Sequence, residues 1–293
     1  MTFAREGRLA VEGGEIWYGI VGDLASDRPP LLVIHGGPGM SHDYLFNLSD
    51  LADEGIEDRA VIFYDQLDAG RSDRPNDPAN WRIPRFLDEI DAIRRALALE
   101  QCAIFGNSWG GTLAAAYGAR QPAGLVKLVL SSPLINTATW IADNAAYRAA
   151  LPSDIRTVMD ACEAEGRTDD PAYLDAVDVF YRRHLCRADP WPEPVVRTFD
   201  VMNPYCYAAM WGPNEFTCTG VLKGYDGTDG LARISAPTLF TCGRFDEATP
   251  ESTERFSRRV PDGRFQVFEQ SSHLAFVEER AAYVGALRDF LDS

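Results

Sequence analysis

Short apolar runs bounded by glycine, proline or aspartate recur along this chain, and they constrain its fold more than any other feature. Residues 30–34, 60–64 and 101–105 are almost continuously apolar, which is typical of parallel strands covered on both faces. Residues 15–21 predict an outer strand, and residues 84–100 carry apolar side chains at helical spacing. This alternation of strands and helices predicts a doubly wound, mostly parallel α/β sheet.

The alternation of predicted strands and helices stops in the middle of the chain. Residues 134–224 read as helical segments rich in Tyr, Trp, Arg and Asp, broken by proline-containing joints. The remaining predicted elements are strands at 125–130, 236–242 and 264–269 and a closing helix at 279–291. We therefore predict one α/β core formed by residues 1–133 and 225–293, with residues 134–224 inserted as a helical cap.

Charge narrows the range of partners. The chain has 293 residues, of which 46% are hydrophobic, so it is long enough to bury a full core. Its 44 acidic residues against 28 basic ones give a formal charge of −16. Long-range repulsion at this charge disfavours a nucleic-acid or anionic-membrane partner.

Cysteine usage and hydropathy indicate the compartment. The six cysteines are scattered and form no CxxC pair, which predicts reduced, buried thiols and neither a zinc site nor a disulfide framework. The first ten residues lack an apolar run of signal length, and no stretch approaches the roughly 20 apolar residues of a membrane span. A cytoplasmic protein is predicted.

The stretch Gly106-Asn-Ser-Trp-Gly-Gly111 places a serine between an apolar run and a run of small residues. G-x-S-x-G at a strand-to-helix turn is typical of a nucleophile elbow, in which the hydroxyl of Ser108 stands above the sheet. Glycines are needed there because side chains would collide with the neighbouring strand and helix. The alternative is a glycine-rich turn with an incidental serine, so the rest of the chain must decide.

A serine nucleophile requires a base and an orienting carboxylate. His273 follows the last predicted strand, and Asp246 follows the strand at 236–242, so both are expected at the carboxyl edge of the sheet. Ser108, Asp246, His273 is the chain order of α/β-hydrolases. Asp226 and Asp229 also satisfy the order, but they precede the strand and are expected at the opposite edge.

An oxyanion hole is predicted in the loop His35-Gly-Gly-Pro-Gly39, which follows an early strand. Glycines allow backbone N–H groups to approach a developing oxyanion, and the N–H groups of Gly37 and Trp109 are the predicted pair. His35 is predicted to brace this loop and not to act as the base.

Several motifs together carry a family resemblance. The chain resembles the proline iminopeptidases of the α/β-hydrolase superfamily, and within them the branch containing the tricorn-interacting aminopeptidase and certain amino-acid amidases. The resemblance covers nearly the whole chain, and its motifs are HGGPGMSHDYL (35–45), FYDQLDAGRSD (63–73), GNSWGGTLA (106–114), WGPNEFTCTG (211–220), GRFDEATP (243–250) and SSHL (271–274). One departure is Asp68, where the family usually has glycine in its DQxGxGxS loop.

The resemblance implies that Glu215, in the cap, and Glu247, beside Asp246, hold the free amino terminus of a substrate. Tyr205, Tyr207 and Trp211 are candidates for an apolar wall around the substrate side chain, although aromatic packing within the cap explains them equally well. The following three residues are predicted to be catalytic: Ser108, Asp246 and His273.

The predicted function is a serine exopeptidase that releases an N-terminal proline, or another small or apolar residue, from peptides or amides through an acyl-enzyme. No metal or organic cofactor is required. An amino-acid amidase, esterase or lactonase with the same triad is the alternative, because one fold hosts many chemistries. A non-catalytic binding module is less favoured because all three triad residues are present. The sequence leaves the oligomeric state open.

Overall fold

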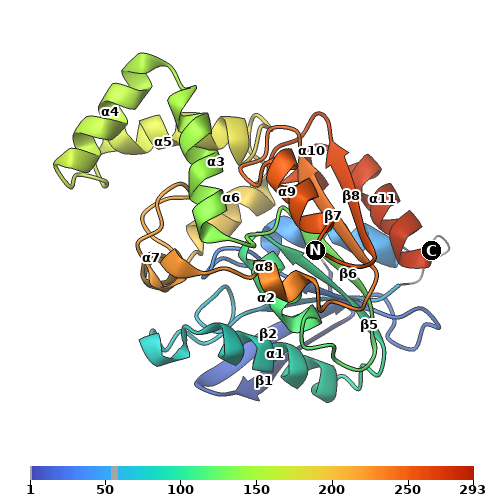
Figure 1. The fold of residues 1–293 in the computed structure, drawn as a ribbon. Coiled ribbons are helices and arrows are strands. Elements are labelled where there is room, and N and C mark those ends of the chain that lie inside the picture. The colour runs from blue at the N-terminus through green and yellow to red at the C-terminus, as the bar shows by residue number, and fades with distance from the viewer. Residues whose placement is uncertain (1, 54–58) are drawn as a thin grey trace.

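A computed structural model describes residues 2–53 and 59–293 of the chain. Figure 1 shows a twisted sheet with helices on both faces and a further group of helices beyond one end of the strands. The strands in the described residues are β1 (Arg5–Val11), β2 (Gly14–Val21), β3 (Leu31–Ile34), β4 (Val61–Asp65), β5 (Cys102–Asn107), β6 (Leu125–Ser131), β7 (Thr238–Gly243) and β8 (Gly263–Phe268).

The strands form one sheet in the order β1-β2-β4-β3-β5-β6-β7-β8. β2 runs antiparallel to both of its neighbours, and all other neighbouring strands are parallel. The predicted mostly parallel α/β-hydrolase fold is therefore confirmed. The strand predicted at residues 15–21 is present as β2, but its predicted place as an outer strand is wrong, because β1 lies at the edge of the sheet. β1 carries charged and exposed side chains and has no continuous apolar run.

Alternation along the buried strands divides the core between the two faces of the sheet. In β3, Leu32 and Ile34 pack into one apolar cluster, whereas Leu31 and Val33 pack into another. The first cluster includes side chains of helices α1 (Ile83–Ala96), α2 (Trp109–Gly118), α8 (Thr228–Leu231) and α9 (Pro250–Ser257), and the second includes side chains of η1 (Asp43–Ala52), α10 (Ala275–Glu278) and α11 (Arg280–Asp292). Both faces are thus covered, as continuous apolar strands require.

The chain between β6 and α8 is mainly helical, as the sequence predicts. Its helices are α3 (Thr137–Ala149), α4 (Ser153–Ala164), α5 (Pro171–His184), α6 (Glu193–Asp200), α7 (Pro204–Met210) and the 3-10 helix η3 (Val221–Gly224); a further 3-10 helix, η2 (Pro78–Asn80), precedes α1. In Figure 1, α4 and α5 project away from the sheet, while α3 and α6 lie closer to it. The boundaries of the cap at residues 134 and 224 stay a prediction.

The cap has a small core of its own. Met159 of α4 and Tyr173 and Phe180 of α5 are almost fully buried in one cluster with Phe216. α6 packs instead against η1, which belongs to the α/β core. Because α6 is held against the core, its side chains have a fixed position above the carboxyl ends of the strands.

Candidate active site

Ser108 lies where β5 turns into α2, with φ 55° and ψ −120°. This strained conformation is held in part by a hydrogen bond from its N–H to the Ser131 carbonyl oxygen (3.0 Å). A Cβ on Gly106 would lie 2.2 Å from the Gly110 carbonyl oxygen, and one on Gly110 would lie 2.2 Å from that of Ile34. The turn therefore needs its glycines, as the sequence predicts.

The residues predicted as base and orienting carboxylate are in contact. Nδ1 of His273 lies 2.8 Å from Oδ1 of the fully buried Asp246. The hydroxyl of Ser132 donates to Oδ2 of Asp246 (2.6 Å), and the N–H of Ala248 donates to Oδ1 (2.8 Å). These bonds fix the carboxylate, which in turn orients the imidazole. Ser132 was not identified from the sequence, because no motif in the chain marks it.

The loop predicted as an oxyanion hole lies beside Ser108. The N–H of Gly36 donates to the hydroxyl of Tyr44 (2.7 Å), which donates to Oδ1 of Asn107 (2.7 Å). Within the described residues, the N–H groups of Gly37 and Trp109 donate to no backbone carbonyl. Trp109 opens α2, so its N–H also adds the positive end of the helix dipole.

Gln66 connects the two sides of this hole. Its backbone N–H donates to Nε2 of the fully buried His35 (3.0 Å), and its side-chain oxygen accepts from the Trp109 indole (2.9 Å). Burial lowers the pKa of His35, so the ring is held as a neutral group that accepts the Gln66 hydrogen bond. His35 thus braces the loop, as the sequence predicts, and Gln66 is a supporting residue that sequence reasoning missed.

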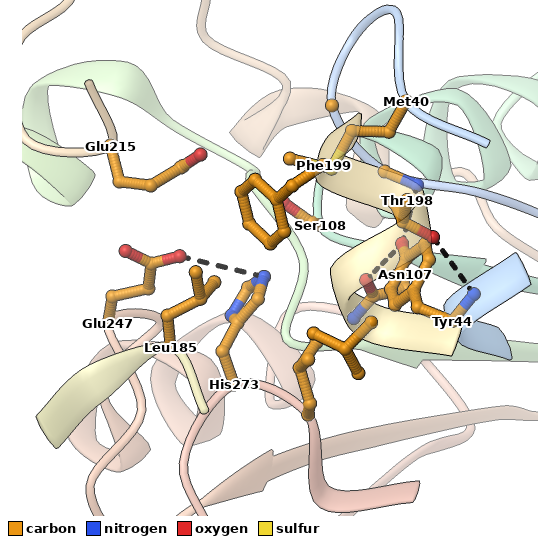
Figure 2. A pocket seen from close by; sticks show the side chains of 14 residues that line it. Met40, Tyr44, Asn107, Ser108, Leu185, Thr198, Phe199, Glu215, Glu247 and His273 are labelled. Atoms are coloured by element: carbon orange, nitrogen blue, oxygen red, sulfur yellow. Dashed lines mark hydrogen bonds and ion pairs between the residues drawn. The ribbon is translucent and has the colours of Figure 1, made fainter. Parts of the chain in front are cut away.

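Glu215 and Glu247 both lie on the wall of the cavity that contains Ser108 (Figure 2). Glu215 accepts a hydrogen bond from the hydroxyl of Tyr207 at Oε1 (2.6 Å). Glu247 is fully buried, and within the described residues neither of its carboxylate oxygens has a hydrogen-bond partner. Its Oε1 lies 3.7 Å from Nε2 of His273.

Both carboxylates have raised pKa values. Burial raises the pKa of Glu215, although the Tyr207 hydrogen bond and His273 oppose that rise. Burial also raises the pKa of Glu247 well above its usual value, and the negative charges of Glu215 and Asp246 add to the effect. A cation placed between the two carboxylates would relieve both the burial and the repulsion.

The predicted aromatic wall needs correction. Tyr205 is 72% exposed and is absent from the cavity lining, because it sits on the outer side of α7. Trp211 is buried and its ring packs edge-on against Trp140, which in turn packs edge-on against His273, so it lies behind the cavity wall. Tyr207 is buried and acts on the site through Glu215.

The cavity has an acidic end and an apolar end. In Figure 2, Glu215 and Glu247 lie to one side of Ser108, whereas Met40, Thr198 and Tyr44 lie to the other. The apolar side chains that line it are Met40, Leu185, Val195, Phe199 and Leu274. Those from the cap carry no motif, and sequence reasoning missed them.

Other groups do not suggest a metal centre. The described residues contain no cluster of three or more His, Cys, Asp or Glu side chains able to hold a metal ion. All six cysteines are free and buried, as predicted. Among residues 2–53 and 59–293, no helix is both long and apolar enough to cross a bilayer.

Comparison with known proteins decides the family. Residues 29–280 match the family model described as alpha/beta hydrolase fold. The proline iminopeptidase of Heyndrickxia coagulans is 42% identical over 289 residues, which cover 98% of this chain and 99% of that protein. The chain belongs to the proline iminopeptidase family. The predicted class, a serine hydrolase of the α/β-hydrolase fold, is thereby confirmed.

Solved structures agree with this membership. The proline iminopeptidase of Mycobacterium smegmatis superposes with a TM-score of 0.91 at 36% identity, and 98% of each chain is covered. The crystal structure of VinJ gives a TM-score of 0.95 at 36% identity over 99% of each chain. Within the proline iminopeptidase family, the assignment of this chain to the branch of the tricorn-interacting aminopeptidase and the amino-acid amidases stays a prediction.

Asp68, which departs from the family's usual glycine, has a clear structural setting. Its φ is 66°, in the left-handed region that favours glycine. Its buried carboxyl group compensates by accepting hydrogen bonds from the Trp81 indole (2.9 Å) and the Asn76 backbone N–H (2.8 Å). Asn76 in turn accepts from the side chain of Asn203 in the cap (2.8 Å). Asp68 thus ties its loop to the joint before α7.

Asp68→Gly is expected to destabilise the protein by about 1–3 kcal/mol. Glycine relieves the left-handed strain, worth about 1 kcal/mol, but it leaves the buried indole N–H of Trp81 without an acceptor, at about 1–3 kcal/mol, and removes the hydrogen bond to the exposed Asn76, at about 0.5–1.5 kcal/mol. Urea unfolding measures the difference. Asp68→Asn is the matched control, since asparagine tolerates this φ and keeps one acceptor, and it should lose less. A more stable glycine variant would show that backbone strain dominates.

Proposed function

We propose that this protein is a serine exopeptidase that releases an N-terminal proline, or another small or apolar residue, from peptides or amino-acid amides. One observation carries the proposal. Glu247 is fully buried, neither of its carboxylate oxygens has a hydrogen-bond partner within the described residues, and it lines the same cavity as Ser108. A buried carboxylate without a hydrogen bond is costly, so the site is suited to a ligand that brings a positive charge and N–H donors. The ammonium group of a free amino terminus supplies it.

Ser108 and His273 line the same cavity, which supports acyl transfer through Ser108. His273 takes the proton of the Ser108 hydroxyl as its oxygen attacks the carbonyl carbon of the N-terminal residue. In this proposal the N–H groups of Gly37 and Trp109 stabilise the oxyanion, and Asp246 stabilises the imidazolium. His273 then gives the proton to the leaving nitrogen as the C–N bond breaks. Water, activated by the same imidazole, cleaves the ester and releases the amino acid.

Recognition of the amine should dominate over recognition of the proline ring. Removing one partner of a buried charge pair costs about 2–5 kcal/mol. Burying the three ring methylenes of proline contributes about 2.4 kcal/mol at about 0.8 kcal/mol each. A free α-amino end is therefore the stronger requirement, and proline is proposed as the residue at that end because the relatives are proline iminopeptidases.

A panel of arylamides tests this proposal. Prolyl, alanyl and leucyl arylamides, their N-acetylated forms and a simple aryl ester are compared by kcat/KM. The free-amine substrates are expected to exceed their acetylated forms by at least about 100-fold, because acetylation removes the charge that Glu215 and Glu247 face. Equal turnover of free and acetylated substrates would contradict an exopeptidase and support the esterase or lactonase alternative.

The panel also separates the remaining alternatives. Turnover of amino-acid amides without turnover of dipeptides would favour an amidase. Complete inactivity on every substrate, together with no labelling by a serine-directed phosphonate, would favour a non-catalytic binding module. The proposed partner is a small peptide or amino-acid amide that binds as the substrate. The cytoplasmic location of the protein stays a prediction.

A further inference from the structure

The cavity around Ser108 opens at one place. Of its lining residues, all of which are described, Gly37 and Phe199 alone are half-exposed, and the others are buried. Gly37 belongs to the oxyanion loop, and Phe199 ends the apolar face of α6. The mouth of the cavity therefore lies between the oxyanion loop and the ring of Phe199.

The acidic end of the cavity offers no second way out. Glu247 is fully buried and Glu215 is 8% exposed. A substrate whose amino group meets these carboxylates has its first carbonyl at Ser108, so the rest of the peptide must leave in the other direction. That direction is the mouth, and Phe199, which Figure 2 shows next to Ser108, lines the same cavity.

The ring of Phe199 is held in place from behind. It stacks on the indole of Trp191 at 5.4 Å between ring centroids and 30° between planes. The indole N–H of Trp191 donates to the carbonyl oxygen of Cys186 (2.9 Å). Val195 and Met40 add buried apolar surface next to the ring. A preformed aromatic surface of this kind binds with little loss of side-chain entropy.

We propose that Phe199 is a specificity-determining residue that contacts the second residue of the substrate, the one directly after the cleaved bond, and that it selects an apolar or aromatic side chain there. The inference rests on the proposed function, because it takes the amino end of the substrate to lie at Glu215 and Glu247. The side chains of Met40, Val195 and Phe199 carry no charge, so a charged second residue would lose hydration without gaining a partner.

This role has a kinetic signature. The second residue departs with the leaving group when the C–N bond breaks, so it is absent from the acyl-enzyme. Its contacts with Phe199 therefore affect kcat/KM, which covers all steps through acylation, and leave the rate of deacylation unchanged. A side chain that contacts the first residue would affect both steps.

Three amidated dipeptides with the same first residue test the proposal: Pro-Phe-NH2, Pro-Leu-NH2 and Pro-Gly-NH2. The wild-type enzyme is expected to cleave the Phe and Leu substrates with kcat/KM about tenfold above the Gly substrate, as partial burial of a large apolar side chain predicts. In Phe199→Ala the preference should shrink to about threefold or less, with the Gly substrate nearly unchanged. Tyr205→Ala removes an exposed aromatic ring from the neighbouring helix and should preserve the wild-type preference.

Two results would overturn the proposal. One is a wild-type enzyme with equal kcat/KM on all three dipeptides. The other is a Phe199→Ala variant that loses the same factor on all three and also changes its preference for the first residue, since Phe199 would then face that residue. Failure of the proposed function is distinguishable, because it appears as equal cleavage of free and N-acetylated substrates whatever residue stands at position 199.

Discussion

Ser108→Ala is expected to lower kcat/KM on a prolyl arylamide by about 10⁴- to 10⁶-fold, the range found when a serine hydrolase loses its nucleophile. The imidazole of His273 and the N–H groups of Gly37 and Trp109 stay in place, but no hydroxyl remains to form the acyl-enzyme. Single-turnover release of the aryl amine measures the loss. The expected trace shows neither a burst nor steady turnover.

A stability measurement and a binding measurement make this result interpretable. Ser108 is 9% exposed, and alanine keeps the Cβ that the strained turn already accommodates, so thermal unfolding should change little. Prolinamide should still bind to the variant, because Glu215 and Glu247 are untouched. Residual activity within about tenfold of wild type would show that another group is the nucleophile.

The sheet was predictable because its central strands are buried on both faces. Continuous apolar runs such as those of β3 and β4 are distinctive, since a strand covered on both sides carries few polar residues. β1 was not predicted from the sequence, because an edge strand is covered on one face only and is held in the sheet by pairing with one neighbour, here β2. Its sequence, REGRLAV, shows neither a long apolar run nor a strict alternation.

The site was predictable where backbone geometry restricts the choice of residue. Gly106 and Gly110 must be glycine because carbonyl oxygens lie where their Cβ atoms would be, and this requirement marks Ser108 in the sequence. The order of Asp246 and His273 after successive strands follows from the parallel sheet. Such restrictions leave a pattern that a single sequence displays.

The cavity wall was not predictable because many apolar residues can serve as wall. Tyr205 and Phe199 are both aromatic residues of short cap helices, yet one is 72% exposed and the other lines the cavity. Their difference depends on how α6 packs against η1, a contact between segments about 150 residues apart. Ser132 was missed for a similar reason, since its hydrogen bond to Asp246 joins residues 114 positions apart.

Glu247→Gln is expected to separate recognition from stability. Glutamine keeps the size of the side chain and removes its charge, so kcat/KM on free-amine substrates should fall by about 10²- to 10³-fold, within the 2–5 kcal/mol range for a buried charge that loses its partner. Activity on N-acetylated substrates, already low, should not fall further. Glu251→Gln is the matched control, because Glu251 is an exposed carboxylate in the first turn of α9, shortly after Glu247 in the chain. This variant should retain activity within about twofold.

The same substitution should stabilise the protein at alkaline pH. Burial and neighbouring carboxylates raise the pKa of Glu247 in the folded state above the value near 4.5 that it has when exposed, so the folded protein binds more protons than the unfolded chain above that pH. The free energy of unfolding therefore decreases as pH rises from about 4.5 through the raised pKa, and glutamine removes this loss. Thermal unfolding at pH 5 and pH 8 measures it. We expect the Tm of Glu247→Gln to exceed that of wild type by more at pH 8 than at pH 5. An equal difference in Tm at both pH values would contradict a raised pKa of Glu247. It would indicate that a cation of the protein itself compensates the charge of this carboxylate.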